Sequence, residues 1–279
     1  MKLAVAALAI VTALQTPTAE EIASRLHGYL LAYEPKLSEL IADERMRQQD
    51  LPGVEVRGDS QPHYVRTLQS EVAFVALPGA AGWLGFRRVL KVDKDDVADG
   101  AGSLREVLSS GAKDDYQKAK ELLADGARFN LGEPRTINLP NLPLEMLHPR
   151  HAKRFSVRTT GQESVRGTRT TRLVFVETFS PTIIKATDGG DMRSIITAWV
   201  EPATGRLLRA DVITRDPRPG AGAFDNVVAV RFKEHTELGL LVPDTMREEF
   251  FAGKGRRAWG EASYTNYRRF TTSARILPQ

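Results

Sequence analysis

The sequence contains no cysteine. This absence excludes disulfides, thiolate metal sites, cysteine nucleophiles and the lipid-carrying cysteine of a bacterial lipoprotein. The sequence also lacks an apolar run of the ~20 residues needed to span a bilayer. Cations barely outnumber anions, because 39 Lys and Arg against 35 Asp and Glu leave a formal charge of +4. We therefore expect a soluble mature chain with no transmembrane segment and no nucleic-acid partner.

The first residues have the pattern of a secretory signal. Lys2 precedes the run Leu3–Leu14, which is small and apolar apart from Thr12. A cationic start, a short apolar core and a polar exit are typical of signal peptides, with cleavage here after Gln15 or after Ala19. We expect residues 1–19 to be a signal peptide, residues 20–279 to be one domain, and the location to be periplasmic or secreted. The alternative is a buried first helix.

The segment Ser194–Arg215 predicts a β-hairpin, around which the other strands are organised. Side chains alternate along both arms, with Ile196, Ala198 and Val200 on one face of the first. Between the arms, Glu201–Arg206 contains a proline that starts a turn and Gly205, which we expect at positive φ.

The rest of the chain predicts helices early and strands late. Thr18 and Glu21 fit a capping box before a helix over Ile22–Ile41, which Pro35 is expected to kink or divide. Strands are expected over Tyr64–Leu77 and Phe86–Val92, helices over Ser103–Leu108 and Asp114–Phe129, a packed crossover over Pro134–Pro149, and further strands over Arg154–Thr160, Thr170–Thr178, Asn226–His235, Asp244–Ala252 and Trp259–Thr272.

Several segments resemble one known family. These are Trp199–Arg206, Val228–Phe232, Leu241–Met246 and Gly260–Arg268. They are similar to the LolA/LolB-like outer-membrane lipoprotein-sorting superfamily, within a group of exported bacterial proteins that share Ala127–Gly132 and Arg135–Asn138. The resemblance implies an α+β fold that is mainly antiparallel β. It would be an open curved half-barrel, with an N-terminal helix and a helical insert packed on its concave side. The missing cysteine excludes a lipid-anchored protein of the LolB type.

No catalytic constellation is recognisable. His148 and His151 lack an obvious third metal ligand, so we interpret them as exposed loop histidines. The acidic turn Asp93–Gly100 lacks the ligand alternation of a calcium loop, and no Gly-x-Ser-x-Gly motif is present. We expect no enzyme activity, no metal site and no cofactor.

A polar cluster lies where the helical insert meets the crossover. It comprises Arg128, Asn130, Arg135, Thr136 and Asn138, with Glu71 and Glu177 as expected partners. A structural network that fixes the insert onto the sheet is the first interpretation, and a ligand site is the second. Arginines that recur along the strands indicate either a solvated face or a surface for anionic headgroups or polymers.

The expected function follows from the half-barrel. Its concave face would be an apolar cradle built from Phe74, Leu173, Phe175, Val228, Val230 and Phe232. Such a cradle favours non-catalytic binding or transport of a lipid, an acyl chain or another apolar ligand. One alternative is an envelope scaffold that binds an envelope protein and encloses no cavity. The other is a hydrolase with an unrecognised site.

Overall fold

The computed structural model describes residues 16–51, 64–76, 83–97, 121, 123–132, 135–186, 188–217, 225–252 and 256–269. The apolar start of the chain and the expected helix over Ser103–Leu108 lie outside these residues. Of the expected helix over Asp114–Phe129, residues 121 and 123–129 are described; residues 121 and 123–127 are helical, and residues 128 and 129 already form a turn.

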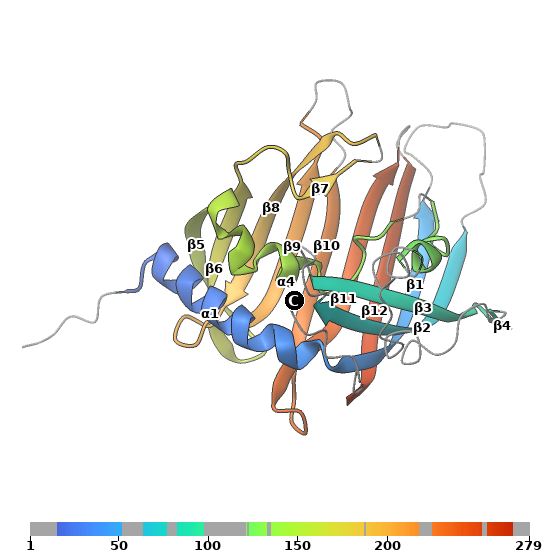
Figure 1. Ribbon diagram of the computed structural model, residues 1–279, viewed down its shortest axis with the longest axis horizontal. Coiled ribbons are helices and arrows are strands. Elements are labelled where there is room, and N and C mark those ends of the chain that lie inside the picture. The colour runs from blue at the N-terminus through green and yellow to red at the C-terminus, as the bar shows by residue number, and fades with distance from the viewer. Residues whose placement is uncertain are drawn as a thin grey trace, which may run out of the picture.

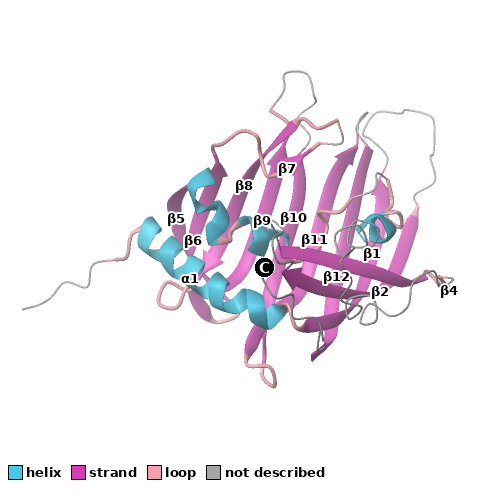
Figure 2. Cartoon of the chain, in the orientation of Figure 1, coloured by secondary structure: helices cyan, strands magenta, loops and turns pink. Residues whose placement is uncertain are grey.

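Strands make up most of the molecule (Figure 2). The helical elements are α1 (Ala19–Leu37), α4 (Leu142–Met146) and the 3-10 helix η1 (Pro149–Arg154). The strands are β1 (Leu40–Leu51), β2 (Val65–Ala76), β3 (Trp83–Val92), β4 (Asp95–Asp96), β5 (Phe155–Val165), β6 (Thr168–Glu177), β7 (Ile184–Lys185), β8 (Asp191–Val200), β9 (Leu207–Arg215), β10 (Asp225–His235), β11 (Leu240–Ala252) and β12 (Arg256–Arg269).

The described strands form one antiparallel sheet that does not close. Its order is β4-β3-β2-β1-β12-β11-β10-β9-β8-β6-β5, and β7 pairs with β8 beside this path. The pairing of β1 with β12 joins the start of the described chain to its end. Figure 1 shows the sheet curving around α1 and α4, which lie on its inner, concave side. The expected open half-barrel is therefore confirmed.

The predicted hairpin is β8 and β9. Ile196, Ala198 and Val200 are buried on its inner face, as the alternation predicted. Gly205 has a φ of +77°, which confirms that the turn places this glycine in the left-handed region.

Helix α1 begins as predicted and ends earlier. The backbone N–H of Glu21 donates to Thr18 Oγ1 at 3.2 Å, and the Thr18 N–H donates to Glu21 Oε2 at 3.0 Å. Pro35 lies within the last turn and does not divide the helix. The expected extension to Ile41 is wrong, because the chain turns after Leu37 and Leu40 already belongs to β1.

Strand β1 was not predicted, because its inward positions are unusually polar. Glu44 and Gln48 are buried on either side of Met46, so the segment has no apolar alternation. Its pairing with both β2 and β12 makes it an interior strand of the sheet. Burial of its polar side chains therefore requires partners from elsewhere in the chain.

The core lies between the inner face of the sheet and the helical elements. α1 contributes the buried side chains Ile22, Ala23, Leu26, Leu30, Tyr33 and Leu37. The crossover before β5 contributes Leu139, Leu144, Met146 and Leu147. These burials confirm that the proline-rich crossover is packed against the sheet rather than extended in solvent.

Candidate functional site: the concave interior

The six predicted cradle residues all lie on the inner face of the sheet. Phe74 comes from β2, two come from β6 and three from β10, and their exposed fractions are 0–3%. All six belong to one continuous apolar core, although β1, β12 and β11 separate Phe74 from the others. Side-chain alternation along each strand explains the common face. We call this surface the apolar floor.

Helix α1 covers the apolar floor and is tied to its surroundings by single polar contacts. Tyr33 Oη donates to the carbonyl of Leu241 at 2.6 Å, and burial holds the pKa of this phenol well above its ordinary value. Near the other end of the helix, Arg25 Nη1 donates to the carbonyl of Pro202 at 2.6 Å. Tyr33 also meets Trp83 edge-on, with ring centroids 6.0 Å apart. Packing of its apolar face holds α1 in place, together with these hydrogen bonds and an ion pair between Glu34 and Arg150 at 2.6 Å.

A small cavity opens between α1, η1 and the start of β5. Its volume is about 50 Å³. It is lined by Ala23, His27, Met146, Leu147, His148, Ala152, Phe155, Val157 and Phe175. Phe175 is the residue that this cavity shares with the apolar floor. This volume has room for one or two water-sized molecules and is far smaller than the volume that an acyl chain requires.

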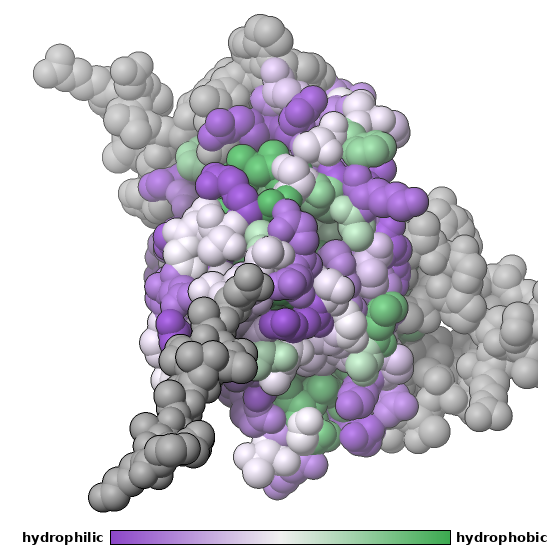
Figure 3. Space-filling view, turned by 90° about the vertical axis from the view of Figure 1, so that its left-hand side faces the viewer, coloured by the Kyte–Doolittle hydropathy of each residue, from purple (hydrophilic) through white to green (hydrophobic). Residues whose placement is uncertain are grey.

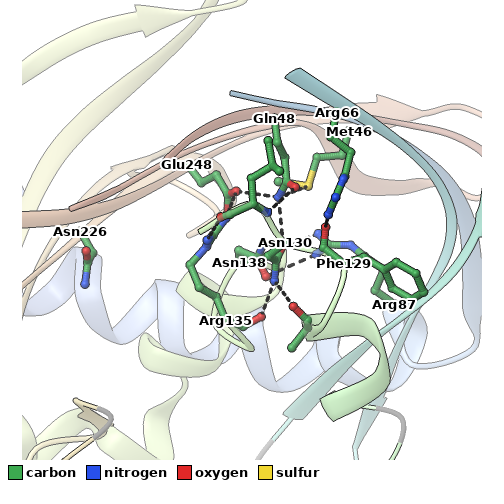
Figure 4. A network of polar contacts seen from close by, with 12 residues as sticks. Met46, Gln48, Arg66, Arg87, Phe129, Asn130, Arg135, Asn138, Asn226 and Glu248 are labelled. Carbon is green, nitrogen blue, oxygen red and sulfur yellow. Dashed lines mark hydrogen bonds and ion pairs between the residues drawn. The ribbon is translucent and has the colours of Figure 1, made fainter. Parts of the chain in front are cut away.

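The other end of the interior is polar, and Figure 4 shows its contacts. Gln48 Nε2 donates to Asn130 Oδ1 at 2.9 Å and to Glu248 Oε1 at 3.1 Å. Asn138 Nδ2 donates to the same Asn130 oxygen at 2.8 Å. Arg135 Nη2 donates to Glu248 Oε1 at 2.8 Å, an ion pair in which both side chains are buried. These bonds join β1 and β11 to the segment that enters the crossover.

A second buried ion pair extends this network towards β3. Arg87 donates to both carboxylate oxygens of Glu44, at 2.5 Å and 2.9 Å, and also to the Asn138 carbonyl at 2.8 Å. Tyr264 Oη donates to Glu44 Oε1 at 3.0 Å. Burial alone lowers the pKa of Arg87, but the Glu44 carboxylate outweighs it and raises that pKa above its ordinary value. Arg87 therefore stays charged, and its bonds to Glu44 and to the Asn138 carbonyl fix the crossover.

The structure brings together only part of the predicted polar cluster. Asn130, Arg135 and Asn138 are buried in the network, whereas Arg128 is exposed and pairs with Asp125 at 2.6 Å. Thr136 is also exposed. The sequence analysis missed the actual partners Gln48, Glu248, Arg87 and Glu44, because all four lie on strands far away in the sequence.

The two expected acidic partners lie elsewhere and need correction. Glu71 pairs with Arg268 of β12, outside the network. Glu177 is buried at the end of β6, where it accepts a hydrogen bond from the Ile183 N–H at 2.9 Å and lies 3.4 Å from Arg154 Nε. Glu71 points to the outer side of β2, and Glu177 fixes the chain after β6.

The expectation that His148 and His151 are exposed loop histidines is wrong, because they lie at and within η1 and make side-chain contacts there. His148 is buried, and its Nδ1 accepts from Arg150 Nε at 2.9 Å while Nε2 lies 3.1 Å from Glu34 Oε2. His151 Nε2 lies 2.8 Å from Glu145 Oε1. Burial, followed by the charge of Arg150, lowers the pKa of His148. The pair links α4 and η1 to α1.

Across the residues that the structure describes, no three or more histidine, aspartate or glutamate side chains are grouped to hold a metal. Within the same ranges, no helix has the length and apolar character needed to cross a membrane.

No protein-family model matches the chain, and neither does any curated protein. Its structure is similar to that of an outer-membrane lipoprotein-sorting protein domain from Vibrio parahaemolyticus, with 12% identity, a TM-score of 0.46, and coverage of 92% of this chain and 95% of that one. It is also similar to the structure of a DUF1329 family protein from Desulfovibrio piger, with 12% identity, a TM-score of 0.41, and coverage of 91% of this chain and 94% of that one. A third similar structure is that of a LolA superfamily protein from Nitrosomonas europaea, with 10% identity, a TM-score of 0.34, and coverage of 94% of this chain and 96% of that one.

These similar structures include a lipoprotein-sorting domain and a LolA superfamily protein, the kind of protein that the sequence segments resemble. At these identities the likeness concerns the fold alone, so a function has to be argued from the contacts within this chain.

Proposed function

We propose that this protein is an exported, non-catalytic binding protein that takes up an acyl chain or another apolar ligand on its concave face. The observation that supports the proposal is the way in which helical elements cover the apolar floor. The amphipathic helix α1 lies over it together with α4 and the crossover, and of these covers α1 is a helix that can move aside without breaking strand pairing. A ligand that replaced α1 would regain the burial that the floor loses, at ~25 cal/mol per Å².

The contacts of α1 favour such a movement. Its buried face is apolar, and its polar ties are the separate hydrogen bonds of Tyr33 and Arg25 and the contacts of Glu34 with Arg150 and His148 at the helix's last turn. Each bond contributes ~1 kcal/mol net, so the helix is held mainly by apolar burial that an apolar ligand also offers. The polar network, by contrast, anchors the crossover with two buried ion pairs. We infer that α1 is the mobile cover and the crossover is the fixed one.

The small cavity beside Phe175 marks the expected entry. It lies where α1 meets η1 and β5, and it already touches the apolar floor. An acyl chain needs ~300 Å³ or more, so binding requires α1 to shift and the cavity to expand.

The alternative is an envelope scaffold that binds a protein and never opens. The dense packing of the floor favours it, because those six side chains are at most 3% exposed. A hydrolase has no comparable support, because no recognised catalytic motif lies in the sequence.

A tethering experiment separates carrier from scaffold. Because the chain has no cysteine, Arg25→Cys with Pro202→Cys can be bridged by a short bifunctional thiol reagent, which locks α1 to the β8–β9 turn. The matched control is Gln162→Cys with Arg169→Cys, two side chains that bond within the β5–β6 hairpin and leave α1 free.

A fluorescent fatty acid should bind saturably to the untethered protein and to the bridged control, and weakly or not at all to the bridged α1 variant. Phe232→Asp should abolish binding if the variant folds. Equal binding by both bridged variants, or no saturable binding by the untethered protein, would contradict the carrier function and favour the scaffold.

A further inference from the structure

The outer face of the sheet, opposite α1, has a row of cationic and hydroxyl side chains that ends at a tryptophan and contains no carboxylate. The strand registers place its members side by side from β1 to β8: Arg45, Ser263, Thr245, Arg231, Arg209 and Trp199. The row crosses five strand intervals, which at ~4.8 Å each is roughly 24 Å. We call it the arginine row.

Two arginines of this row are placed directly opposite each other. Arg231 of β10 faces Arg209 of β9 across the strand pair, an arrangement of like charges that is unfavourable by itself. Asp211 neutralises the charge of Arg209 through an ion pair in which Oδ2 lies 2.5 Å from Nη2. The Arg209 guanidinium also stacks over the Trp199 ring, with Cζ 4.1 Å from the ring centroid. Arg231 and Arg45 have no ion-pair partner within the described part of the chain. Their charges are therefore available to an external anion.

A second row on the same face is aliphatic. Val176, Ile195, Ile213 and Val227 lie opposite one another across β6, β8, β9 and β10. Ile195 is 37% exposed, and the others are half-buried. This aliphatic row lies four residues along the strands from the arginine row, which is roughly 13 Å.

An open groove of about 720 Å³ runs along the arginine row as far as Arg209, and Val227 is the member of the aliphatic row that lines it. Six arginines line it against two carboxylates: Arg45, Arg47, Arg166, Arg209, Arg231 and Arg247. Arg166 belongs to the β5–β6 turn and pairs with Asp244 of β11, so the turn reaches across the outer face and bounds the groove. Figure 3 shows the side of the molecule seen from the left of Figure 1, where apolar patches alternate with polar surface.

We propose that this groove docks an extended acidic polypeptide segment of a partner protein. Between the two rows lie Thr197 of β8, Asp211 of β9 and Ala229 of β10. Asp211 is neutralised by Arg209, and the small side chains of Thr197 and Ala229 leave room for a backbone. Alternate side chains of an extended chain point to opposite sides. Carboxylates on one side would reach the arginine row, and apolar side chains on the other would reach the aliphatic row.

The shape of the surface favours a polypeptide over a bilayer. The groove lies on the outer face and is bounded by the β5–β6 turn, and the sheet that forms it is curved (Figure 1). A flat membrane would touch only the rim, whereas an extended chain can follow the floor. Arginine suits this role because its planar guanidinium binds carboxylates through two parallel hydrogen bonds.

The test uses a labelled ten-residue peptide that alternates glutamate and valine. We expect saturable binding to the full-length mature protein, weakened by salt because exposed charges are screened. A peptide of the same composition with its glutamates and valines in two separate blocks should bind at least about tenfold more weakly. Equal binding of both peptides would overturn the proposal, because charge alone would then explain it.

Two variants test the residues. Arg45→Ala with Arg231→Ala should weaken binding by about tenfold or more, whereas Lys94→Ala with Lys153→Ala removes the same charge elsewhere and should not. Arg231→Glu should abolish binding and keep or raise the melting temperature, because it creates an opposite-charge pair with Arg209.

Unchanged peptide binding in these arginine variants would overturn the proposal. So would binding to phosphatidylglycerol vesicles without binding to the peptide. The fatty-acid experiment reports on the opposite face of the sheet, so the two proposals can fail independently.

Discussion

Gly260 of β12 provides the space in which the carboxylate of Glu248 lies. A Cβ on Gly260 would come within 2.8 Å of Glu248 Oε1. Gly260 is the register partner of both Glu248 on β11 and Gln48 on β1. Because it has no side chain, Gln48 and Glu248 can meet at 3.1 Å across the intervening strand. This glycine is therefore what allows the buried network to cross the sheet.

Gly260→Ala should strongly destabilise the protein. The added methyl group displaces Glu248 and so disturbs its ion pair with Arg135. Breaking a buried ion pair costs about 3 kcal/mol or more in the free energy of unfolding. Denaturant unfolding measures this loss. The matched control is Gly28→Ala in α1, where nothing lies within 4 Å, and which should raise stability by up to ~1 kcal/mol. A Gly260→Ala variant as stable as the parent protein would contradict this account.

Gly205→Ala should loosen α1 as well as strain the hairpin. Gly205 has a φ of +77°, and a Cβ there would lie 2.2 Å from the carbonyl oxygen of Arg25. Strain at positive φ costs about 1–3 kcal/mol, and the clash with the α1 backbone adds to it. The comparison is Gly167→Ala, with a φ of +82° and open space around it. Gly205→Ala should lower the melting temperature clearly more than Gly167→Ala does. Equal effects would show that the contact with α1 contributes nothing.

The sequence predicted elements whose side chains follow a simple period. The β8–β9 hairpin alternates apolar side chains, and α1 has both a capping box and helical spacing, so both were recognised. In each case, local chemistry and burial agree.

Strand β1 and the network were not predictable in this way. The inward face of β1 contains Glu44 and Gln48, whose burial is tolerated only because Arg87 and Glu248 meet them from other strands. Those partners lie 43 and 200 residues away in the sequence. A polar strand of this kind looks like a solvated segment until its partners are known. The recurring arginines are visible in the sequence, but their alignment into one row was not predictable, since only the strand registers place Arg45, Arg231 and Arg209 in line.

Signal cleavage should follow Gln15 rather than Ala19. The capping box of α1 needs the side chain and N–H of Thr18, and cleavage after Ala19 would remove them. Loss of an N-cap typically costs ~1 kcal/mol. Mass analysis of the protein from its native host should therefore give Thr16 as the first residue. Recovery of a chain that begins at Glu20, or of intact Met1 in the cytosol, would contradict this prediction.

The last prediction concerns acid. Burial lowers the pKa of both His27 and His148 below the ordinary value of 6.5, and Arg150 lowers that of His148 further, while Glu34 and Glu145 oppose the shift. The unfolded chain then binds protons more readily than the folded one. These histidines therefore contribute stability above pH 6.5 that is lost as pH falls through their folded pKa values.

Thermal unfolding between pH 8 and pH 5 should show this loss, and His27→Gln with His148→Gln should reduce it. Glu34→Gln tests the group that opposes the lowering of the His148 pKa. It removes a carboxylate 3.1 Å from His148, so the pKa of His148, followed by NMR, should fall further. An unchanged pH slope in the double variant, or a rise of that pKa in Glu34→Gln, would show that the junction of α1 with η1 is not built around a neutral His148.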